Sequence, residues 1–246
     1  MENALLIGLS RQMALQTQMD AIANNLANIQ TAGYKGDSLK FEEFVMPVAQ
    51  VDGMDGSDGQ VSFVYQARQI RDFSEGDIIA TGNPLDIAIN GKGWLAVETP
   101  DGERYTRNGH LKVDLEGRLT TADGNPVLGL GGAIVLAPEE TDLTIAADGT
   151  ISTKDGEKAR LRIVTFDDEH RMEKAGNTLF STDEQPKPAA NPRVAQGMIE
   201  QSNVHSVAEL ARMIEVSRSY ISTAKLLDGT NDLRQRAIEQ LGRLQA

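Results

Sequence analysis

The three histidines are the first residues to test for metal or acid–base chemistry. His110, His170 and His205 lie far apart in the sequence, and none has the spacing of a metal-binding pair. The chain contains no cysteine, which excludes thiol catalysis, cysteine metal sites and disulfides. It also contains no G-x-S-x-G motif, so a serine nucleophile of the hydrolase type is not indicated.

Acidic and glycine-rich segments do not indicate a catalytic site either. In residues 52–59 the aspartates are three apart, unlike the alternate ligands of a calcium loop, so we expect a flexible loop. Residues 129–132 lack the Lys-Ser/Thr of a phosphate loop and indicate a turn. Residues 167–170 indicate a solvated loop, and nothing selects a glycosidase pair among 36 acidic residues. We therefore expect no enzyme, no cofactor, and no catalytic or metal-binding residue.

Bulk properties exclude further classes of protein. The net charge of -12 argues against a nucleic-acid-binding protein. No apolar run reaches 18 residues, so we expect no membrane-spanning helix. The first residues show no cationic region and no A-x-A cleavage site, so a conventional secretory signal is not expected. Taken alone, these properties favour a cytoplasmic protein.

The residues that stand out instead belong to an uncharged N-terminal helix, predicted over residues 1–30. Between Asn3 and Tyr34 only Arg11 and Asp20 are charged, and alanines and amides cover the remaining faces. Such a helix would bury most of its circumference against other protein. Gly33 would end it. The predicted contact residues are Leu15, Met19, Ile22, Asn24, Asn25, Leu26, Asn28 and Ile29. The alternatives are a helix lying on its own domain's core and amides that only fray the helix end.

The middle of the chain changes to a strand pattern. Residues 31–75 indicate a linker with a hairpin, since Val61, Phe63 and Tyr65 alternate. Residues 76–184 carry short apolar strands separated by Asp-Gly turns, which predicts an antiparallel barrel or sandwich. Residues 185–205 begin with a proline-rich stretch and are predicted to be a second linker.

A second long helix is predicted over residues 206–246. Ser206 and Glu209 have the spacing of a capping box. Gly229 weakens the helix by about 1 kcal/mol and could mark a kink or an early end. The predicted contact residues follow a heptad pattern at Leu210, Met213, Ser217, Tyr220, Ala224 and Leu227, and Ile214 and Ile221 widen the seam. The pattern continues at Asn231, Arg234, Ile238 and Leu241.

Together these elements predict an α+β protein with its two terminal helices packed as a coiled coil and a central antiparallel all-β domain. A two-helix coil of this length leaves apolar surface outside the pair, which favours further subunits.

Three separated sequence blocks resemble the bacterial flagellar rod and hook family. The first is residues 23–28 (Ala-Asn-Asn-Leu-Ala-Asn) with residues 31–35 (Thr-Ala-Gly-Tyr-Lys). The second is residues 81–94 with residues 105–109 (Tyr-Thr-Arg-Asn-Gly). The third begins at residues 202–204 (Ser-Asn-Val) and continues along the last helix. The motif positions are Gly33, Tyr34, Lys35, Gly82, Asn83, Asp86, Gly91, Gly93, Asn203 and Arg218.

The resemblance implies a structural subunit of the flagellar basal body, in the proximal rod. It implies export without cleavage through the flagellar type III apparatus to the periplasm. It further implies that the terminal helices form an inner layer, D0, around the axial channel, inside an outer β-domain, D1. The implied partners are other copies of this chain, the rod proteins FlgB, FlgC and FlgG, and the export apparatus. The alternatives are the distal-rod member FlgG or another rod or hook protein and, in a different class, a stand-alone β-domain binding module on a helical dimer stalk.

Overall fold

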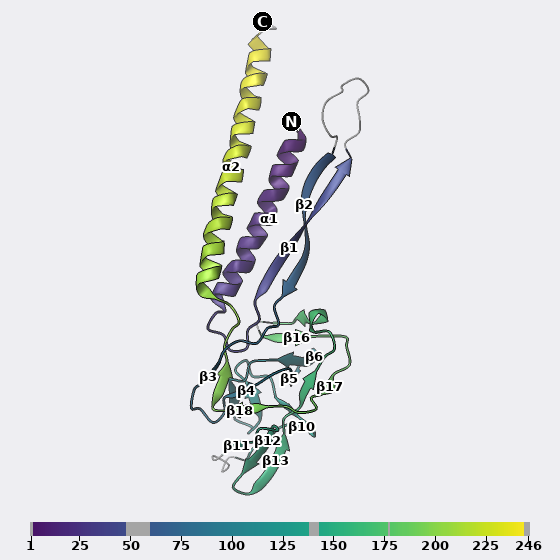
Figure 1. Cartoon of the computed structure of the whole chain (residues 1–246), viewed down its shortest axis with the longest axis vertical. Helices are drawn as coiled ribbons and strands as arrows, with labels where there is room; N and C mark the ends of the chain where they lie inside the picture. The colour runs from purple at the N-terminus through teal and green to yellow at the C-terminus, as the bar shows by residue number, and fades with distance from the viewer. Residues whose placement is uncertain (1, 48–59, 138–142, 177, 244–246) are drawn as a thin grey trace. The chain divides into compact units, whose positions relative to one another are not determined.

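The computed structural model describes residues 2–47, 60–137, 143–176 and 178–243 (Figure 1). The predicted loop at residues 52–59 lies outside them. The chain divides into two compact units. The first, here called the helical unit, comprises residues 1–26, 37–70 and 206–246, and the second, the β unit, comprises residues 27–36 and 71–205.

The helical unit contains two long helices and one pair of strands. The helices are α1 (Glu2–Ala27) and α2 (Ser206–Arg243), and they run in opposite directions (Figure 1). The strands β1 (Asp37–Pro47) and β2 (Gln60–Arg71) form a two-stranded sheet, which is the hairpin expected between residues 31 and 75. A Cβ atom added at Gly8 of α1 would lie 2.5 Å from Leu227 Cδ2 of α2, so the helices come close together there.

The end of α1 differs from the prediction. α1 ends at Ala27, before Ile29, because the chain turns there: the Thr31 amide donates to the Asn28 carbonyl at 3.1 Å. Gly33, with φ of +67°, therefore lies beyond the helix and is not its C-terminal stop. The alternative of an early end at Gly229 does not occur, since α2 continues through it to Arg243.

The β unit is built on a six-stranded antiparallel sheet. Its strand order is β15-β16-β6-β5-β14-β17. The bounds along that order are Glu173–Lys174, Leu179–Ser181, Gly102–Thr106, Trp94–Thr99, Ile163–Thr165 and Lys187–Pro188. A short 3-10 helix, η1 (Glu169–Arg171), precedes β15.

Smaller antiparallel groups complete the β unit. The pairs are β3 (Ile78–Ala80) with β19 (Met198–Glu200), β4 (Ile87–Ile89) with β18 (Val194–Gln196), β7 (Leu111–Val113) with β8 (Leu119–Thr121), and β9 (Leu128–Gly129) with β10 (Gly132–Ala133). A three-stranded group contains β11 (Thr144–Ile145), β12 (Thr150–Thr153) and β13 (Gly156–Arg160). The helices and the antiparallel β region confirm the α+β class.

The segment predicted as a second linker is part of the β unit. Residues 185–205 supply β17, β18 and β19, which pair with β14, β4 and β3. The prediction of a linker there was wrong, because strands of two or three residues next to prolines show no alternation to recognise. The pairing joins the end of the β unit to its beginning.

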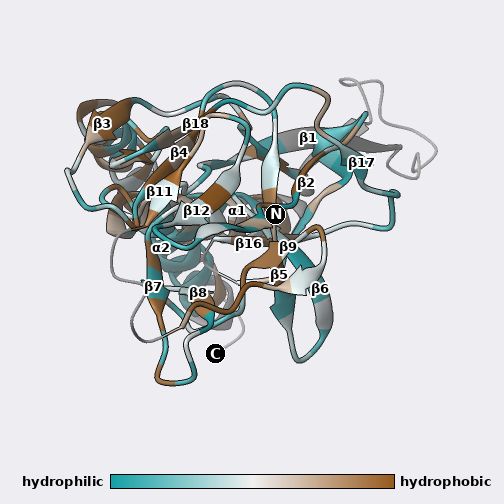
Figure 2. Cartoon of the chain, turned by 90° about the horizontal axis from the view of Figure 1, so that it is seen from below, coloured by the Kyte–Doolittle hydropathy of each residue, from teal (hydrophilic) through white to brown (hydrophobic). Residues whose placement is uncertain are grey.

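Strand β5 separates two apolar clusters. Leu95 and Val97 belong to a large cluster with residues of β4, β7, β8, β12 and β18, and brown marks the apolar β4 in Figure 2. Trp94 and Ala96 belong to the second cluster, where the Trp94 and Phe180 ring centroids are 5.1 Å apart. Because side chains alternate along a strand, β5 is buried on both faces. In the described part of the chain, neither helix is long and apolar enough to cross a membrane.

Candidate functional site

The turn after α1 carries the first sequence motif into the β unit. The Gly33 amide donates to the Glu200 carbonyl oxygen at 2.8 Å. A Cβ atom at position 33 would lie 2.3 Å from the Arg107 carbonyl carbon, and the positive φ also disfavours any other residue. Gly33 is therefore required for this close approach.

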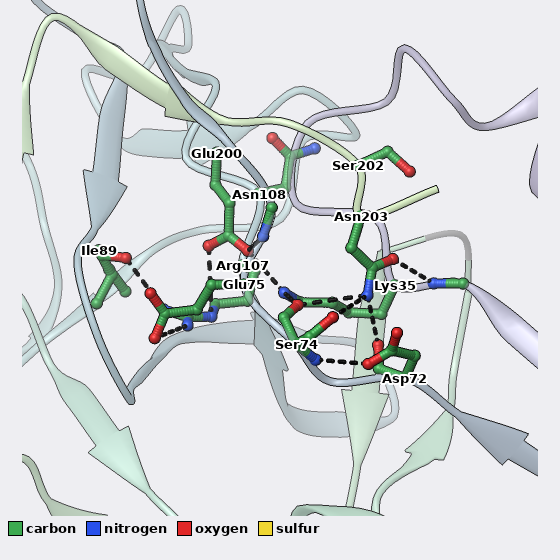
Figure 3. Close-up of polar contacts among 12 residues, drawn as sticks. Lys35, Asp72, Ser74, Glu75, Ile89, Arg107, Asn108, Glu200, Ser202 and Asn203 are labelled. Atoms are coloured by element: carbon green, nitrogen blue, oxygen red, sulfur yellow. Dashed lines mark hydrogen bonds and ion pairs between the residues drawn. The ribbon is translucent and has the colours of Figure 1, made fainter. Parts of the chain in front are cut away.

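A buried ion pair joins the first motif to the last strand of the β unit. Lys35 Nζ lies 2.6 Å from Glu200 Oε1, and the side chains are 0% and 1% exposed (Figure 3). Lys35 also donates to the Ser74 carbonyl at 2.6 Å, and the Gly76 amide donates to Glu200 Oε1 at 3.2 Å. Burial lowers the pKa of Lys35, although the Glu200 carboxylate opposes that shift. The pair therefore compensates for much of the cost of burying each charge.

Arg107 brings the middle motif to the same carboxylate. Its Nε atom lies 3.5 Å from Glu200 Oε2, so Glu200 sits between two cations. The guanidinium donates to the Ile89 carbonyl at 3.3 Å and to the Gly91 carbonyl at 2.9 Å. Its central carbon lies 5.7 Å from the Trp94 ring centroid. These contacts connect the ion pair to the apolar cluster around Trp94.

Asn203 ties three segments of the chain together with one amide group. Its Oδ1 accepts from the Gly36 amide at 2.8 Å, and its Nδ2 donates to the Asp72 carbonyl at 2.7 Å and the Ser74 carbonyl at 3.3 Å (Figure 3). The Asp72 amide donates in turn to the Gly36 carbonyl at 3.0 Å. Motifs from both parts of the chain thus meet in one junction, here defined as residues 33–36, 72–76, Arg107, Glu200 and Asn203.

Tyr34 extends the junction on one side. Its side chain is fully buried, and Lys174 Nζ lies 4.4 Å from the ring centroid and 3.3 Å from the hydroxyl. A cation over an aromatic face is attracted by the ring quadrupole. The junction directs its charged groups at one another and at backbone carbonyls, which is an arrangement for holding segments in place.

The remaining motif residues shape turns of the β unit. Asn83 Nδ2 donates to Asp86 Oδ1 at 3.0 Å, and Asp86 Oδ1 lies 2.8 Å from His110 Nδ1. Positive φ angles occur at Gly82, Gly91 and Gly93. Among the described residues, no group of three or more His, Asp or Glu side chains is placed to hold a metal ion.

Asn25 was assigned to a contact with another subunit, and for this residue the assignment was wrong. Its side chain is buried within its own chain, where Nδ2 donates to the Asp37 carbonyl at 2.8 Å and Oδ1 accepts from the Asp37 amide at 2.9 Å. The amide therefore fastens α1 to the start of β1. Asn24 is exposed, and Asn28 is half-buried, with its Oδ1 accepting from the Thr31 hydroxyl at 3.2 Å.

The predicted apolar contact residues have unequal exposure. Ile22 is buried, whereas Leu15, Met19, Leu26 and Ile29 are half-buried. On α2, Leu210, Ile214 and Ile221 are 47%, 53% and 50% exposed. Half-buried positions on α2 are Met213, Ser217, Tyr220, Ala224 and Leu227, and Arg218 is exposed. Large apolar side chains are also exposed at Leu6, Leu9, Met13, Leu226, Leu233 and Ile238. The helical unit thus displays apolar surface along both helices.

Two members of the junction were not identified from the sequence. Glu200 and Arg107 were assigned no role, although Arg107 lies inside a motif block. A single acidic residue after an apolar pair, as in residues 198–200, gives no sign that it will be buried. A signal was available at Lys35, where the first charge after a long uncharged segment follows directly on Gly33-Tyr34.

Three flagellar family models match the chain. "Flagella basal body rod protein" matches residues 5–35, and "Flagellar hook protein FlgE/F/G D1 domain" matches residues 88–153. "Flagellar basal body rod FlgEFG protein C-terminal" matches residues 195–241. The first match contains Gly33 and Lys35, and the last contains Glu200 and Asn203, so the junction joins residues of both matches.

Curated relatives cover nearly the whole chain. A flagellar basal-body rod protein FlgF from Caulobacter vibrioides is 39% identical over 99% of this chain and 100% of its own length. A FlgF from Escherichia coli is 31% identical over 98% of this chain and 99% of its own. A flagellar basal-body rod protein FlgG from Bacillus subtilis is 28% identical over 97% and 98%.

Proposed function

Since the chain belongs to the flagellar basal-body rod protein family and is a structural subunit of that rod, we propose that it occupies the proximal rod as a FlgF-type subunit. Full-length similarity to FlgF proteins at 39% and 31% identity, against 28% for the FlgG of Bacillus subtilis, supports the proximal position. A distal-rod position like that of FlgG is the alternative. The family is a structural one, and its place is the flagellar basal body.

We further propose that the two units take different layers of the rod. The helical unit forms the inner D0 layer, with α1 and α2 packed as a coiled coil, and the β unit forms the outer D1 layer. The predicted boundaries placed D1 at residues 76–184, and the strands up to Glu200 favour extending it to about residue 205. Residues 31–75 then connect the layers through the β1–β2 hairpin.

One observation carries this proposal: α2 exposes large apolar side chains along its length. Leu210, Ile214 and Ile221 are each about half-exposed. Completing the burial of one such side chain would contribute on the order of 1 kcal/mol. Repeated heterologous contacts between identical subunits build an open helical tube. The predicted contact residues of the two terminal helices, except Ile22 and Asn25, which are buried within this chain, are the proposed subunit contacts.

Family membership also supports a proposal for the neighbouring rod proteins and for the route by which the chain reaches the rod. We propose contacts with FlgB, FlgC and FlgG at the two ends of the layer, and export through the flagellar type III apparatus into the periplasm. A chain without cysteine suits this route, because no disulfide can form before or after threading.

The test is Ile214→Asp, with Ile214→Leu as the matched control. In cells that lack the native gene, we expect Ile214→Asp to abolish swimming and the recovery of rods, since a carboxylate would enter an apolar contact. Ile214→Leu should support swimming. Trp94, the single tryptophan, is buried in the β unit, so unchanged emission would show that the β unit still folds. Normal motility with Ile214→Asp would contradict the assignment of α2 to the subunit interface.

Sedimentation of the purified chain separates this proposal from the binding-module alternative. A rod subunit should be a monomer with weakly ordered helices at micromolar concentration, because its neighbours are missing. A stable dimer with fully helical ends would favour a private dimer stalk.

A further inference from the structure

A groove in the helical unit has the chemistry of a specific docking site. It has a volume of about 540 Å³ and is lined by residues of α1 and α2. The helices approach closely where Gly8 faces Leu227, and the groove opens beside that contact. Arg11 from α1 and Arg218 from α2 both line it, together with the exposed Leu226.

The two arginines are the charged groups of this groove. Both are exposed, and in the described part of the chain neither lies within 4.0 Å of a carboxylate. The Thr223 hydroxyl is already committed to the Ser219 carbonyl at 2.9 Å. Guanidinium groups bind carboxylates in bidentate fashion, and an apolar wall such as Leu226 reduces the competition from water. The groove therefore suits a partner that presents two carboxylates.

The same helix carries such a pair of carboxylates further along its length. Asp228 and Asp232 are exposed and make no ion pair within the described residues. At four residues apart they lie on one face of α2, with Cβ atoms about 6 Å apart. At about 100° per residue, Asp228 and Asp232 are roughly 80° and 40° around the helix from Arg218, and the pair begins about 15 Å further along α2 at the usual helical rise. A copy of this chain thus presents the two arginines and the acidic pair at different heights along α2.

We propose that the groove between α1 and α2 receives the Asp228–Asp232 turn of a second copy of this chain, with its carboxylates on Arg11 and Arg218. The inference rests on the proposed helical assembly and names one contact within it. Because the groove and the acidic pair are different patches, the contact is heterologous and repeats from copy to copy without closing. It also gives a role to Arg218, the exposed motif residue that the junction does not use.

Charge exchange tests the contact. Cells that lack the native gene would carry the groove variant Arg11→Glu/Arg218→Glu, the acidic-turn variant Asp228→Lys/Asp232→Lys, or all four changes together. Each double variant should lower the number of rods recovered per cell by at least about tenfold, because like charges would face each other at every subunit contact. The four changes together should restore the number to within about threefold, since the complementary pairs are re-formed. Arg11→Lys/Arg218→Lys, which keeps both charges, is the matched control and should stay within about threefold of the native chain.

Each outcome decides the proposal. Normal rod numbers with either double variant would overturn it, and so would failure of the four-fold variant to restore them, including the case in which a different rod protein supplies the carboxylates. Trp94 emission checks that each variant still folds its β unit. The rod assignment itself is tested separately, because it fails only if cells without the gene, or with Ile214→Asp, still swim.

Discussion

The two units of this protein differ in how completely they satisfy their own side chains. In the β unit, Trp94 is 1% exposed, and the charges of Lys35 and Glu200 are buried against each other. In the helical unit, Ile214 is 53% exposed and Arg218 lies in a groove without a carboxylate partner among the described residues. The β unit thus buries its ion pair and its tryptophan within one chain, whereas the proposed assembly would cover the exposed groups of the helical unit with other chains.

The junction joins segments of the β unit that lie next to the two helices in the sequence. Lys35 and Glu200, far apart in the sequence, form the ion pair, Asn203 accepts from the Gly36 amide, and the Gly33 amide donates to the Glu200 carbonyl oxygen. The segment that follows α1 and the segment that precedes α2 are therefore held together within the β unit.

The largest expected effect is a loss of stability of the β unit when its buried ion pair is broken. Lys35→Met leaves the Glu200 carboxylate buried without its nearest cation, which should lower the free energy of unfolding by about 3–5 kcal/mol. Urea unfolding followed by Trp94 emission measures this. Lys92→Met, at an exposed position, is the control and should change stability by less than about 0.5 kcal/mol. Equal effects of the two substitutions would show that the Lys35–Glu200 ion pair does not stabilise the β unit.

Two glycines of the β unit, Gly33 and Gly82, differ in how closely other atoms approach them, so alanine substitutions test the close packing at the junction. Gly33 and Gly82 have similar φ angles of +67° and +74°, so alanine would strain the backbone equally at both. At position 33 the new Cβ would overlap Arg107, whereas at position 82 nothing lies within 4 Å. Gly33→Ala should lower the unfolding free energy by about 2–4 kcal/mol and Gly82→Ala by about 1–2 kcal/mol. A larger loss from Gly82→Ala would contradict the close approach at the junction.

Tyr105 should make the stability of the β unit depend on pH. Burial, reinforced by the Glu103 carboxylate, raises the pKa of Tyr105 to about 12 from a usual value of 10.0. Between those values the unfolded chain has released the phenolic proton and the folded chain has kept it. Stability should therefore fall as the pH rises from 10 to 12, by about 2–3 kcal/mol from this group.

The measurement is urea unfolding at a series of pH values, with Tyr105→Phe as the control. The phenylalanine variant lacks the titrating group, so its stability should fall less steeply over the same range. Other alkaline transitions, including that of Lys35, are shared by both proteins and cancel in the difference. Parallel curves for the two proteins would show that Tyr105 keeps its ordinary pKa.

Patterns that repeat over many residues predicted the long helices, whereas the roles of single buried residues could not be predicted from the sequence. The heptad pattern from Leu210 to Leu241 predicted α2, because a helix of 38 residues repeats its signal many times. The strands at residues 187–200 were missed because each is only two or three residues long. Asn25 was assigned to the wrong partner, since an amide pattern shows that a hydrogen bond is needed and leaves open whether Asp37 or another chain supplies it.

The smallest expected effect on stability comes from a substitution in the helical unit. Ile214→Asp should change the unfolding free energy of the purified chain, read from Trp94, by less than about 0.5 kcal/mol, because Ile214 is already half-exposed. The same change should abolish rod assembly. A destabilisation close to that of Lys35→Met would mean that α2 supports the β unit within one chain.

Amide hydrogen exchange on the purified chain and on isolated rods tests the difference between the units most directly. In the purified chain, the account predicts slow exchange in β5 and β6 and fast exchange along α2, and in assembled rods it predicts that exchange in α2 becomes slow as well. Amides of α2 that are as protected as those of β5 in the purified chain would contradict it, because the helical unit would then need no neighbours.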